Sequence, residues 1–425
     1  MSAAGSVTAH HSPGCLRMKY ETRLIWLLGT TFGFVFFDRN AVNYLMPFIA
    51  GDLQFTNQQV GLVASALSFT WAIASFLGGV FSDRTGNRKT VLLVTVIAFS
   101  LCSFLSGLAG SFLALFLARL LMGLAEGPIL PVSQSLVAFE SADERRGHNM
   151  GVMQNFGSNL IGSFAAPLIL VAIATHYSWR GAFYVAGVPG LVMALLIAKY
   201  VHEPKVHELH PSAPRAGNEM RHAEMLRYRN MWLCMLISIV MVAWMVLGWA
   251  FLPLFYVKVK HLSDGEMSVL MSVLGLSAAF FSLVVPRLSD RLGRRPVVIA
   301  FNLVGLLVPL AALYFDGSLY ALGALIFVGW SASGTFPLFM GTIPSETIPA
   351  RYVATSLGMT VGLGEILGGV TSPAVAGWAA DLYGLRAPIV IQAGCAIAGT
   401  VLALFLKETA PSQLAATGAA ARVAS

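Results

Sequence analysis

Long apolar runs follow one another along almost the whole chain, separated by short breaks that contain charged residues, glycine or proline. Each run holds about twenty residues, the length at which an α-helix crosses the hydrocarbon core of a bilayer. The runs are continuously apolar, whereas the strands of a membrane barrel are shorter and alternate. The pattern predicts an all-α membrane protein with twelve transmembrane helices, at residues 24–49, 57–81, 90–110, 112–137, 150–175, 180–200, 231–257, 267–288, 296–315, 319–343, 353–378 and 386–406.

The composition agrees with this pattern. Of the 425 residues, 56% are hydrophobic and 11% are charged, and the mean hydropathy is +0.73. A soluble globular chain has about 25% charged residues. The sequence contains no phosphate-binding loop, no His-Glu-x-x-His metal motif and no plausible set of nucleophile and base, so an enzyme is not expected.

Lysine and arginine concentrate in alternate loops between the predicted spans. The basic loops contain Arg84, Arg88, Lys89, Arg145, Arg146, Arg287, Arg291, Arg294 and Arg295. The intervening loops are poorer in basic residues, with Lys258 and Lys260 as the exception. Because basic loops stay in the cytoplasm, we expect both termini to be cytoplasmic and the protein to lie in the inner, or plasma, membrane. Contact of the basic loops with anionic lipid explains the net charge of +7 without nucleic acid.

The chain contains an internal repeat. Residues 83–88 after the second span return as residues 290–295 after the eighth, 207 residues later, and six spans fit in that interval. Two six-helix bundles of similar design are predicted, at residues 23–200 and 230–407, related by an axis along the membrane normal. A polar cytoplasmic linker at residues 201–229 joins them. A disordered tail at residues 1–22 and a cytoplasmic tail at residues 408–425 flank them.

The cysteines and histidines suggest no further chemistry. The four cysteines are scattered without metal-ligand spacing, and the histidines of the linker are interpreted as solvated. We therefore expect no disulfide framework, no metal and no cofactor other than the coupling ion. The first apolar run is too long for a cleaved signal peptide, so it is expected to remain in the membrane.

Four charged residues lie well inside the first and fourth predicted spans. Asp38 and Arg39 fall in the first span, and Arg119 and Glu126 in the fourth. An ionised side chain at mid-bilayer costs roughly 2.5–3.5 kcal/mol, so four of them indicate a compensating role, which we interpret as ion-coupled transport. Arg119 and Glu126 share one helix face about 10 Å apart, with Gly123 between them to let a neighbouring helix approach.

Asp38 and Arg39 point about 100° apart around their helix, so they cannot both face one partner. At least one of them should meet a charge on another helix, and Arg119 is a candidate partner for Asp38. An alternative is that these residues form internal salt bridges that hold helices together. Buried ion pairs stabilise poorly, so this alternative explains their cost less well.

The loop after the second span carries a recognisable pattern. Its residues Gly79, Asp83, Arg84, Gly86, Arg88 and Lys89 resemble the signature Gly-x-x-x-Asp-Arg-x-Gly-x-Arg-Lys/Arg of the major facilitator superfamily, with a degenerate copy that includes Asp290, Arg291 and Arg295. Gly79 allows two helices to approach closely, and Gly86 permits a tight turn. The resemblance implies the superfamily fold over all twelve spans. It also implies that the two loops latch the halves together on the cytoplasmic side and release them during transport.

The charges of the first and fourth spans narrow the resemblance. Asp38-Arg39 followed by Asn43, together with Arg119 and Glu126, is similar to the pattern of the anion:cation symporter family. Members of that family carry sugar acids, sialic acid, tartrate, phthalate and similar organic anions. The resemblance implies uptake of a small organic anion with protons, by alternating access. We expect a monomer in the lipid bilayer.

Counting charges suggests how protons and an anion are coupled. With all four groups ionised the N-terminal half is neutral, whereas protonation of Asp38 and Glu126 leaves two uncompensated cations. An anion is then favoured, and release of the protons weakens its binding. Arg39 or Arg119 is the candidate for direct contact with the carboxylate, because a guanidinium binds a carboxylate through two hydrogen bonds.

A further acid, Glu365, lies at mid-span in the eleventh helix among Gly362, Gly364, Gly368 and Gly369. It is interpreted as a second proton-coupling site, as a contact for a substrate hydroxyl, or as a hydrogen-bonded structural residue. Other side chains are candidates for lining the substrate site: Asn43, Tyr44, Gln154, Asn159, Trp244 and Ser333. Each of these also occurs in membrane helices as a packing or hydrogen-bonding residue.

Two other functions fit parts of the sequence. A drug/proton antiporter shares the fold, but such proteins have a Gly-Pro pair in a glycine-rich fifth span, and here Pro167 stands without a preceding glycine. A receptor that senses a solute without moving it normally has a sizeable cytoplasmic domain. The linker and the C-terminal tail are short, which favours a transporter.

Overall fold

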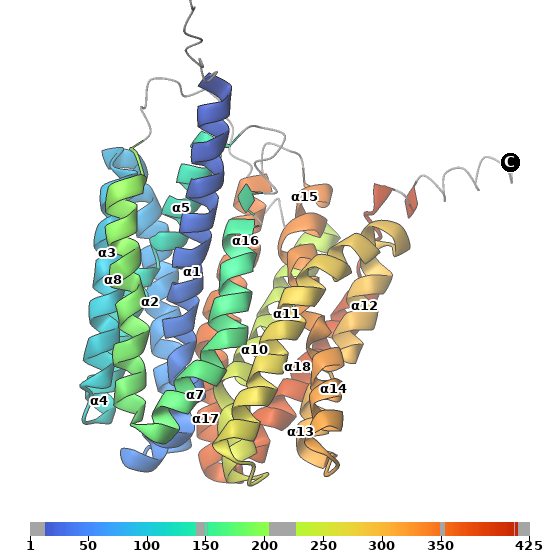
Figure 1. The fold of residues 1–425 in the computed structure, drawn as a ribbon. Helices are drawn as coiled ribbons and strands as arrows, with labels where there is room; N and C mark the ends of the chain where they lie inside the picture. The colour runs from blue at the N-terminus through green and yellow to red at the C-terminus, as the bar shows by residue number, and fades with distance from the viewer. Residues whose placement is uncertain are drawn as a thin grey trace, which may run out of the picture.

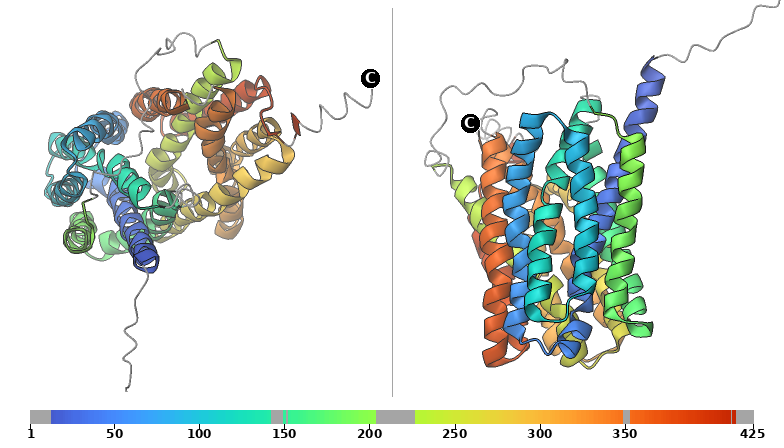
Figure 2. Two further views of the ribbon diagram at one scale, coloured as in Figure 1. Left: turned by 90° about the horizontal axis from the view of Figure 1, so that it is seen from above. Right: turned by 90° about the vertical axis from the view of Figure 1, so that its left-hand side faces the viewer.

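The computed structural model describes residues 13–141, 149–150, 152–203, 227–348, 353–411 and 413–414. The described residues form helices and connecting turns, without a strand. The helices run roughly parallel to one another in two bundles that lie side by side, the N-terminal bundle in blue to green and the C-terminal bundle in yellow to red (Figures 1 and 2). The all-α prediction is confirmed.

The N-terminal bundle contains the six predicted spans. They are α1 (Pro13–Asp52), α2 (Asn57–Thr85), α3 (Arg88–Gly107), α4 (Phe112–Glu126) continued by α5 (Ile129–Glu140), the fifth span of η1 (Val152–Phe156), η2 (Ser158–Ala165) and α7 (Ala166–His176), and α8 (Trp179–Tyr200). The start of α1 differs from the prediction: residues 13–22 belong to this helix and not to a disordered tail. Residues 1–12 lie outside the described residues.

The C-terminal bundle repeats this arrangement. Its elements are α10 (Arg229–Lys258), α11 (Asp264–Leu292), α12 (Arg294–Val304) followed by α13 (Leu307–Tyr314), the tenth span of α14 (Leu319–Gly329), η4 (Trp330–Thr335), η5 (Leu338–Thr342) and α15 (Ile343–Thr347), the eleventh of α16 (Val353–Leu363), η7 (Gly364–Val370) and α17 (Thr371–Tyr383), and α18 (Arg386–Leu404). Ten helical stretches of the described chain are long and apolar enough to cross a membrane. The two remaining predicted spans correspond to α1 and to residues 353–383. Most of the predicted linker, residues 204–226, lies outside the described residues.

Serine and threonine caps mark where alternate helices begin. The side chain at the N-cap accepts a backbone N–H from the first turn of α2, α4, α8, α11 and α14, at Thr56, Ser111, Ser178, Ser263 and Ser318. The first turn of a helix has backbone donors without intrahelical partners, and a hydroxyl at this position satisfies one of them. These five caps lie at the same end of the molecule because alternate helices begin there.

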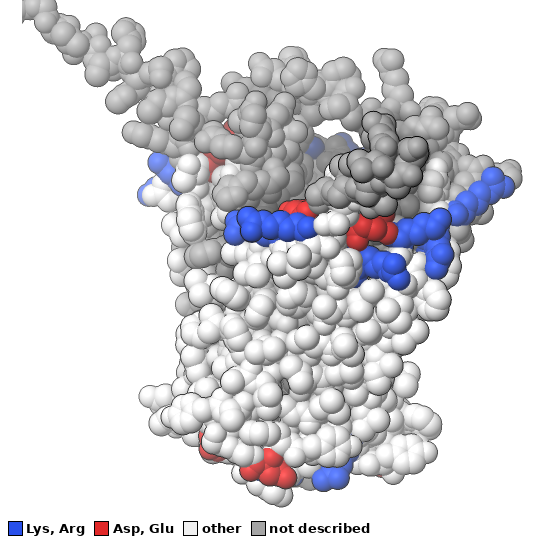
Figure 3. All heavy atoms as spheres, turned by 90° about the vertical axis from the view of Figure 1, so that its right-hand side faces the viewer, with Lys and Arg blue, Asp and Glu red and all other residues white. Residues whose placement is uncertain are grey.

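Charged groups distinguish the two ends. We call the end that carries residues 84–89 and 291–295 the basic end, and the end that carries residues 52–57 and 381 the opposite end. On the face shown in Figure 3, Lys and Arg gather toward the basic end, and a broad uncharged belt separates them from the few charged residues of the opposite end. This belt is the surface expected against hydrocarbon.

A pair of glutamates repeats the same contact at the basic end of each bundle. Glu203 accepts the backbone N–H groups of Arg88 (2.8 Å) and Lys89 (2.7 Å) at the start of α3. Glu408 accepts those of Arg294 (2.8 Å) and Arg295 (3.1 Å) at the start of α12. A carboxylate at a helix N-terminus satisfies free donors and favours the helix dipole. Glu408 was predicted to begin a tail, and it is instead a packed part of the C-terminal bundle.

The bundles contact each other closely at the opposite end. Asp381 of α17 accepts the backbone N–H groups of Asn57 (2.8 Å) and Gln58 (2.9 Å) at the start of α2. A Cβ atom on Gly61 would lie 2.0 Å from the carbonyl oxygen of Pro373, so the two backbones touch there. The halves are therefore in direct contact at the opposite end.

Candidate functional site

Three charged side chains are enclosed inside the N-terminal bundle. Asp38 of α1 and Arg119 of α4 are fully buried, and Glu126 at the end of α4 is 1% exposed. The close approach predicted at Gly123 is confirmed, because a Cβ there would lie 2.2 Å from the hydroxyl of Thr70 on α2. This packing excludes water from the face that Arg119 and Glu126 share.

The enclosed charges are not joined by direct ion pairs. Asp38 Oδ1 accepts a hydrogen bond from Ser103 Oγ on α3 (2.8 Å). The guanidinium of Arg119 lies 4.9 Å from the centre of the Phe183 ring, and its Nη1 contacts the sulfur of Met122 (3.1 Å). Its Nε and Nη2 atoms and both oxygens of Glu126 have no hydrogen-bond partner among the described residues.

Arg119 is therefore an electrostatic neighbour of both carboxylates without a hydrogen bond to either. Asp38 and Glu126 both interact with Arg119 through space. Arg119, the predicted partner of Asp38, is thus its neighbour but not its direct contact. The hydrogen bond to Asp38 comes from Ser103 instead. A buried ion held by few hydrogen bonds is costly, and protonation of a carboxyl group relieves that cost.

Arg39 is placed differently from Arg119. Its side chain is half-buried, and its guanidinium carbon lies 4.9 Å from the centre of the Trp71 ring and 5.5 Å from that of Phe36. It interacts electrostatically with Glu126 in its own half and with Glu365 in the other. No described residue forms a hydrogen bond with it. The planar face of the Arg39 guanidinium thus lies against aromatic rings. Its N–H groups form no hydrogen bond with the described residues.

Glu365 lies on a π-helical segment, η7, that is packed through glycines. A Cβ on Gly364 would lie 2.1 Å from Ser238 Oγ, and one on Gly368 would lie 2.4 Å from the carbonyl oxygen of Ile239, both on α10. Such insertions into α-helices are rare and are frequent at functional sites. The glycine packing therefore fixes η7 against α10 and holds Glu365, which is half-buried, at mid-span.

The fifth span shows the same distortion in the other half. Gly157 and Gly162 precede Gly364 and Gly369 by the repeat interval of 207 residues. Gly157 separates the π-helical segments η1 and η2, and Gly162 lies within η2. A Cβ on Gly157 would lie 1.9 Å from the carbonyl oxygen of Gly29 on α1. The repeat equivalent of Glu365 is Ser158. The glycine pattern was visible in the sequence, but the helix distortion it accompanies was not.

The other predicted lining residues divide into two groups. Tyr44 and Trp244 are fully buried: the Tyr44 ring lies 6.1 Å from that of Trp249 across the two halves, and Trp244 donates its indole N–H to the carbonyl of Gly305 (3.2 Å). Trp244 therefore belongs to the core of the C-terminal bundle. The remaining candidates are half-buried, namely Asn43, Gln154, Asn159 and Ser333.

The structure places the predicted latch residues in different surroundings. Gly86 ends α2 with φ of 69°, which confirms the tight turn. Arg88 is buried and donates to Ser135 Oγ (2.7 Å). In the second copy the buried arginine is Arg294, which the prediction omitted, and Arg295 is exposed. Gly79 lines the pocket described below. Arg84 and Arg291 are exposed. The other two predicted latch residues are Asp83, whose side chain is not described, and Asp290.

Arg294 forms the centre of an ion network. Its guanidinium pairs with Asp290 (2.5 Å) at the end of α11 and with Glu346 (3.0 Å) on α15. Thr409 also donates to Glu346 (2.6 Å). The second basic loop is therefore tied to its own bundle.

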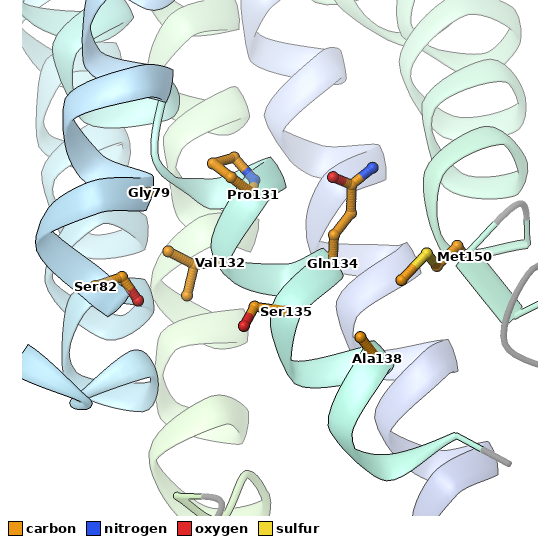
Figure 4. Close-up of a pocket in the computed structure, with 8 residues that line it drawn as sticks. All are labelled: Gly79, Ser82, Pro131, Val132, Gln134, Ser135, Ala138 and Met150. Carbon is orange, nitrogen blue, oxygen red and sulfur yellow. The ribbon is translucent and has the colours of Figure 1, made fainter. Parts of the chain in front are cut away.

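A pocket of about 250 Å³ lies beside the first basic loop (Figure 4). It is lined by Gly79, Ser82, Pro131, Val132, Gln134, Ser135, Ala138 and Met150. Its walls come from α2, α5 and the segment at residues 149–150, so it lies toward the basic end and away from Asp38. The absence of a side chain at Gly79 helps to create it.

Comparison with known proteins identifies the family. The model of the Major Facilitator Superfamily matches residues 28–366 and 249–424. The chain belongs to the major facilitator superfamily. A bacterial homologue of the human lysosomal transporter Spinster, solved in an inward-facing and occupied conformation, has the same fold with a TM-score of 0.76, 17% identity and coverage of 91% of this chain and 96% of that one. The superfamily consists of transporters and not of enzymes, as the sequence predicted.

Relatives of this superfamily member include proteins named for organic acids. The probable sulfoacetate transporter SauU of Cupriavidus necator is 26% identical over 92% of this chain and 94% of its own length. The hexuronate transporter of Bacillus subtilis is 35% identical over 44% of each chain. The quinolone resistance protein NorA of Staphylococcus aureus is 24% identical over 88% of this chain and 94% of its own. The predicted resemblance to organic-anion transporters is supported by the first two.

Proposed function

We propose that this transporter carries a small organic anion together with protons, by alternating access of a site between its two bundles. The observation that carries the proposal is the state of Arg39. It is half-buried, interacts with acidic groups of both halves, and forms no hydrogen bond with a described residue. A guanidinium in this state is a ready partner for a carboxylate, which it binds through two parallel hydrogen bonds.

The two arginines take different roles in this proposal. Arg119 is fully buried beneath Phe183 and is enclosed by its own bundle. It supplies a fixed positive charge to Asp38 and Glu126, while Arg39 binds the cargo. The sequence left this choice open, and the difference in exposure favours Arg39.

Protons enter the mechanism through Asp38 and Glu126. Each is buried near Arg119, and neither is neutralised by a hydrogen-bonded ion pair. Protonation of both leaves Arg39 and Arg119 as uncompensated cations, which favours an anion at Arg39. Loss of the protons returns the N-terminal half to neutrality and favours release of the anion. No further ion is required by this scheme.

Alternating access is supported by the contact between the halves at one end of the structure. Asp381 of α17 holds the start of α2 there, and a Cβ on Gly61 would touch the backbone of Pro373. We propose that the basic end faces the cytoplasm, because basic loops remain there. Labelling of cysteines engineered into residues 204–226 by an impermeant thiol reagent tests this orientation. Labelling in intact cells would reverse it.

Drug efflux coupled to protons is the second candidate, and the match to the quinolone resistance protein is the observation that favours it. A cationic drug would be attracted by Glu126 and Glu365 and repelled by Arg39. The balance of these charges in the protonated state is positive, so an anion is the better cargo.

The deciding experiment is ligand-induced thermal stabilisation of the purified protein, because it detects binding without a proton gradient. Organic acids are compared with their uncharged amides, which preserve size and shape. We expect at least one acid to raise the melting temperature in a saturable way while its amide does not. A neutral or cationic compound that binds better than every acid would favour the drug antiporter.

A further inference from the structure

A second cavity, of about 430 Å³, opens on the outer face of the N-terminal bundle. It lies between α2 and α3, and the ribbon of α4 and α5 lies between those two helices in the right-hand view of Figure 2. We call it the outer groove, and its walls include Ala74, Gly78, Phe81, Val94, Leu124 and Pro128. Phe81, Val94 and Leu124 are 59%, 59% and 47% exposed, so the groove opens away from the bundle. Its lining contains no charged residue, which suits a surface against hydrocarbon.

Small residues of α2 create the outer groove. A Cβ on Gly78 would lie 2.5 Å from the side chain of Pro128, and Ala74 lies one turn earlier on the same face of the helix. The position 207 residues after Ala74 is Phe281 on α11. The Phe281 ring lies 6.2 Å from that of Phe301 on α12, so aromatic rings pack there between the two equivalent helices. The groove is therefore a feature of the N-terminal bundle and does not follow from the repeated architecture.

A positive charge lies at the basic end of the outer groove. Along α2 the groove runs from Ala74 to Phe81, about 10 Å, and Arg84 follows three residues later on the same side of the helix. Arg84 is exposed, and it forms no hydrogen bond or ion pair with a described residue. The lysine of the same loop is turned elsewhere, because Lys89 Nζ donates to the carbonyl of Ala198 on α8 (2.8 Å). Arg84 is thus the cation at the mouth of the groove.

We propose that the outer groove binds one acyl chain of an anionic phospholipid, whose phosphate pairs with Arg84. In a phospholipid the phosphate lies next to the start of the acyl chains, and here a cation lies next to the end of an apolar groove. The exposed Thr90 hydroxyl on α3 lines the same groove and can donate to an ester or phosphate oxygen. A free phosphate leaves the apolar part empty, and an uncharged apolar molecule makes no use of Arg84. A basic residue at the membrane surface favours anionic over zwitterionic lipid.

The site requires neither the proposed cargo nor proton coupling. Its position nevertheless connects it to the buried charges, because Leu124 and Pro128 of the groove precede and follow Glu126 in the sequence. A bound chain packs against the junction of α4 and α5 from outside the bundle, while Glu126 lies inside it. We therefore expect the lipid to raise the melting temperature of the protein.

The test uses the purified full-length protein with phosphatidylglycerol and phosphatidylcholine that have the same acyl chains. Native mass spectrometry measures the dissociation constant of the first bound lipid. Arg84→Gln removes the charge, and Arg291→Gln is its control because Arg291 is the exposed repeat equivalent. Val94→Trp fills the groove. Val192→Trp is its control, since Val192 is 49% exposed on α8 and lies at a similar distance from the basic end.

We expect wild type to bind phosphatidylglycerol about fivefold more tightly than phosphatidylcholine, the scale of one basic residue near the membrane surface. Arg84→Gln should remove this preference, and Val94→Trp should weaken the binding of both lipids. The two control variants should behave as wild type. Equal affinities of wild type for the two lipids overturn the inference, as does an Arg84→Gln or Val94→Trp protein that binds like its control.

A second measurement needs no variant. Phosphatidylglycerol with a photoreactive diazirine in one acyl chain is bound to wild type at low lipid-to-protein ratio, illuminated, and the labelled peptides are identified. We expect the label within residues 74–95 or 124–128, which line the outer groove. Label confined to other lipid-facing helices overturns the inference.

Discussion

The two bundles repeat one architecture but have different interiors. The N-terminal bundle buries Asp38, Arg119 and Glu126. At the positions 207 residues later the C-terminal bundle has Met245, Ile326 and Ser333. Apart from Arg294 at the basic end, its own buried polar residues among those described are neutral, and they include Asn302, Thr335 and Gln392.

The C-terminal bundle shows that helices of this architecture can pack away from the basic end without fully buried charges. Thr335 donates to Asn302 (3.0 Å), and Gln392 donates to the carbonyl of Trp244 (3.0 Å). These hydrogen bonds join helices without the cost of a buried charge. The charges of the N-terminal bundle therefore require another explanation, and the proposed ion coupling supplies one. Glu365, which is half-buried, is the charged residue at mid-span in the described C-terminal bundle.

The largest expected effect follows from removing the titratable groups of the charged bundle. Asp38→Asn and Glu126→Gln remove the proton sites but keep the size of each side chain. Both variants should lose proton-driven uptake against a concentration gradient, and at least one should retain exchange of labelled for unlabelled anion. Uptake and counterflow in proteoliposomes measure the two activities separately.

The control for this pair is an acid outside the charged cluster. Glu346 pairs with Arg294 at the basic end, and Glu346→Gln should lower stability without changing the ratio of uphill uptake to exchange. If Asp38→Asn and Glu126→Gln both concentrate the substrate as wild type does, protons are not carried by these residues. The difference between the bundles would then be structural.

A smaller effect should distinguish the two arginines. Arg39→Lys keeps the charge but loses the two parallel donors, so we expect the dissociation constant of the cargo acid to rise at least about tenfold, or about 1.4 kcal/mol. Arg119→Lys should lower the melting temperature because Arg119 is fully buried against Phe183. Its effect on cargo affinity should stay within about threefold. The opposite pattern, with binding lost in Arg119→Lys alone, would place the cargo at Arg119.

The sequence predicted the spans because each apolar run must cross the same hydrocarbon thickness, and it predicted the repeat from residues 83–88 and 290–295. It also predicted Arg119, Glu126 and Asp38 as interior charges, since charges within apolar runs are visible directly. It did not predict which arginine is enclosed, because exposure depends on how Phe183 and Trp71 pack from other helices. Nor did it predict Glu203 and Glu408 as helix caps, because their contacts join residues more than a hundred positions apart.

The smallest effect is expected from removing one hydroxyl group in each bundle. Ser103 donates to the carboxylate of Asp38 (2.8 Å), and Thr335 donates to the amide of Asn302 (3.0 Å). Thr335→Val keeps the shape and should cost about 1 kcal/mol of stability, measured as a small fall in melting temperature. The pH dependence of uptake should not change, because the group it contacts is neutral.

Ser103→Ala removes a hydrogen bond to a group that titrates in the proposed cycle. A hydrogen bond to a charged group is worth about 1.5–3 kcal/mol, so its loss should alter the balance between the protonated and ionised forms of Asp38. We therefore expect the pH profile of uptake to shift in Ser103→Ala and to remain in place in Thr335→Val. Equal behaviour of the two variants would mean that the hydroxyls of both bundles serve packing alone, and that Asp38 does not titrate during transport.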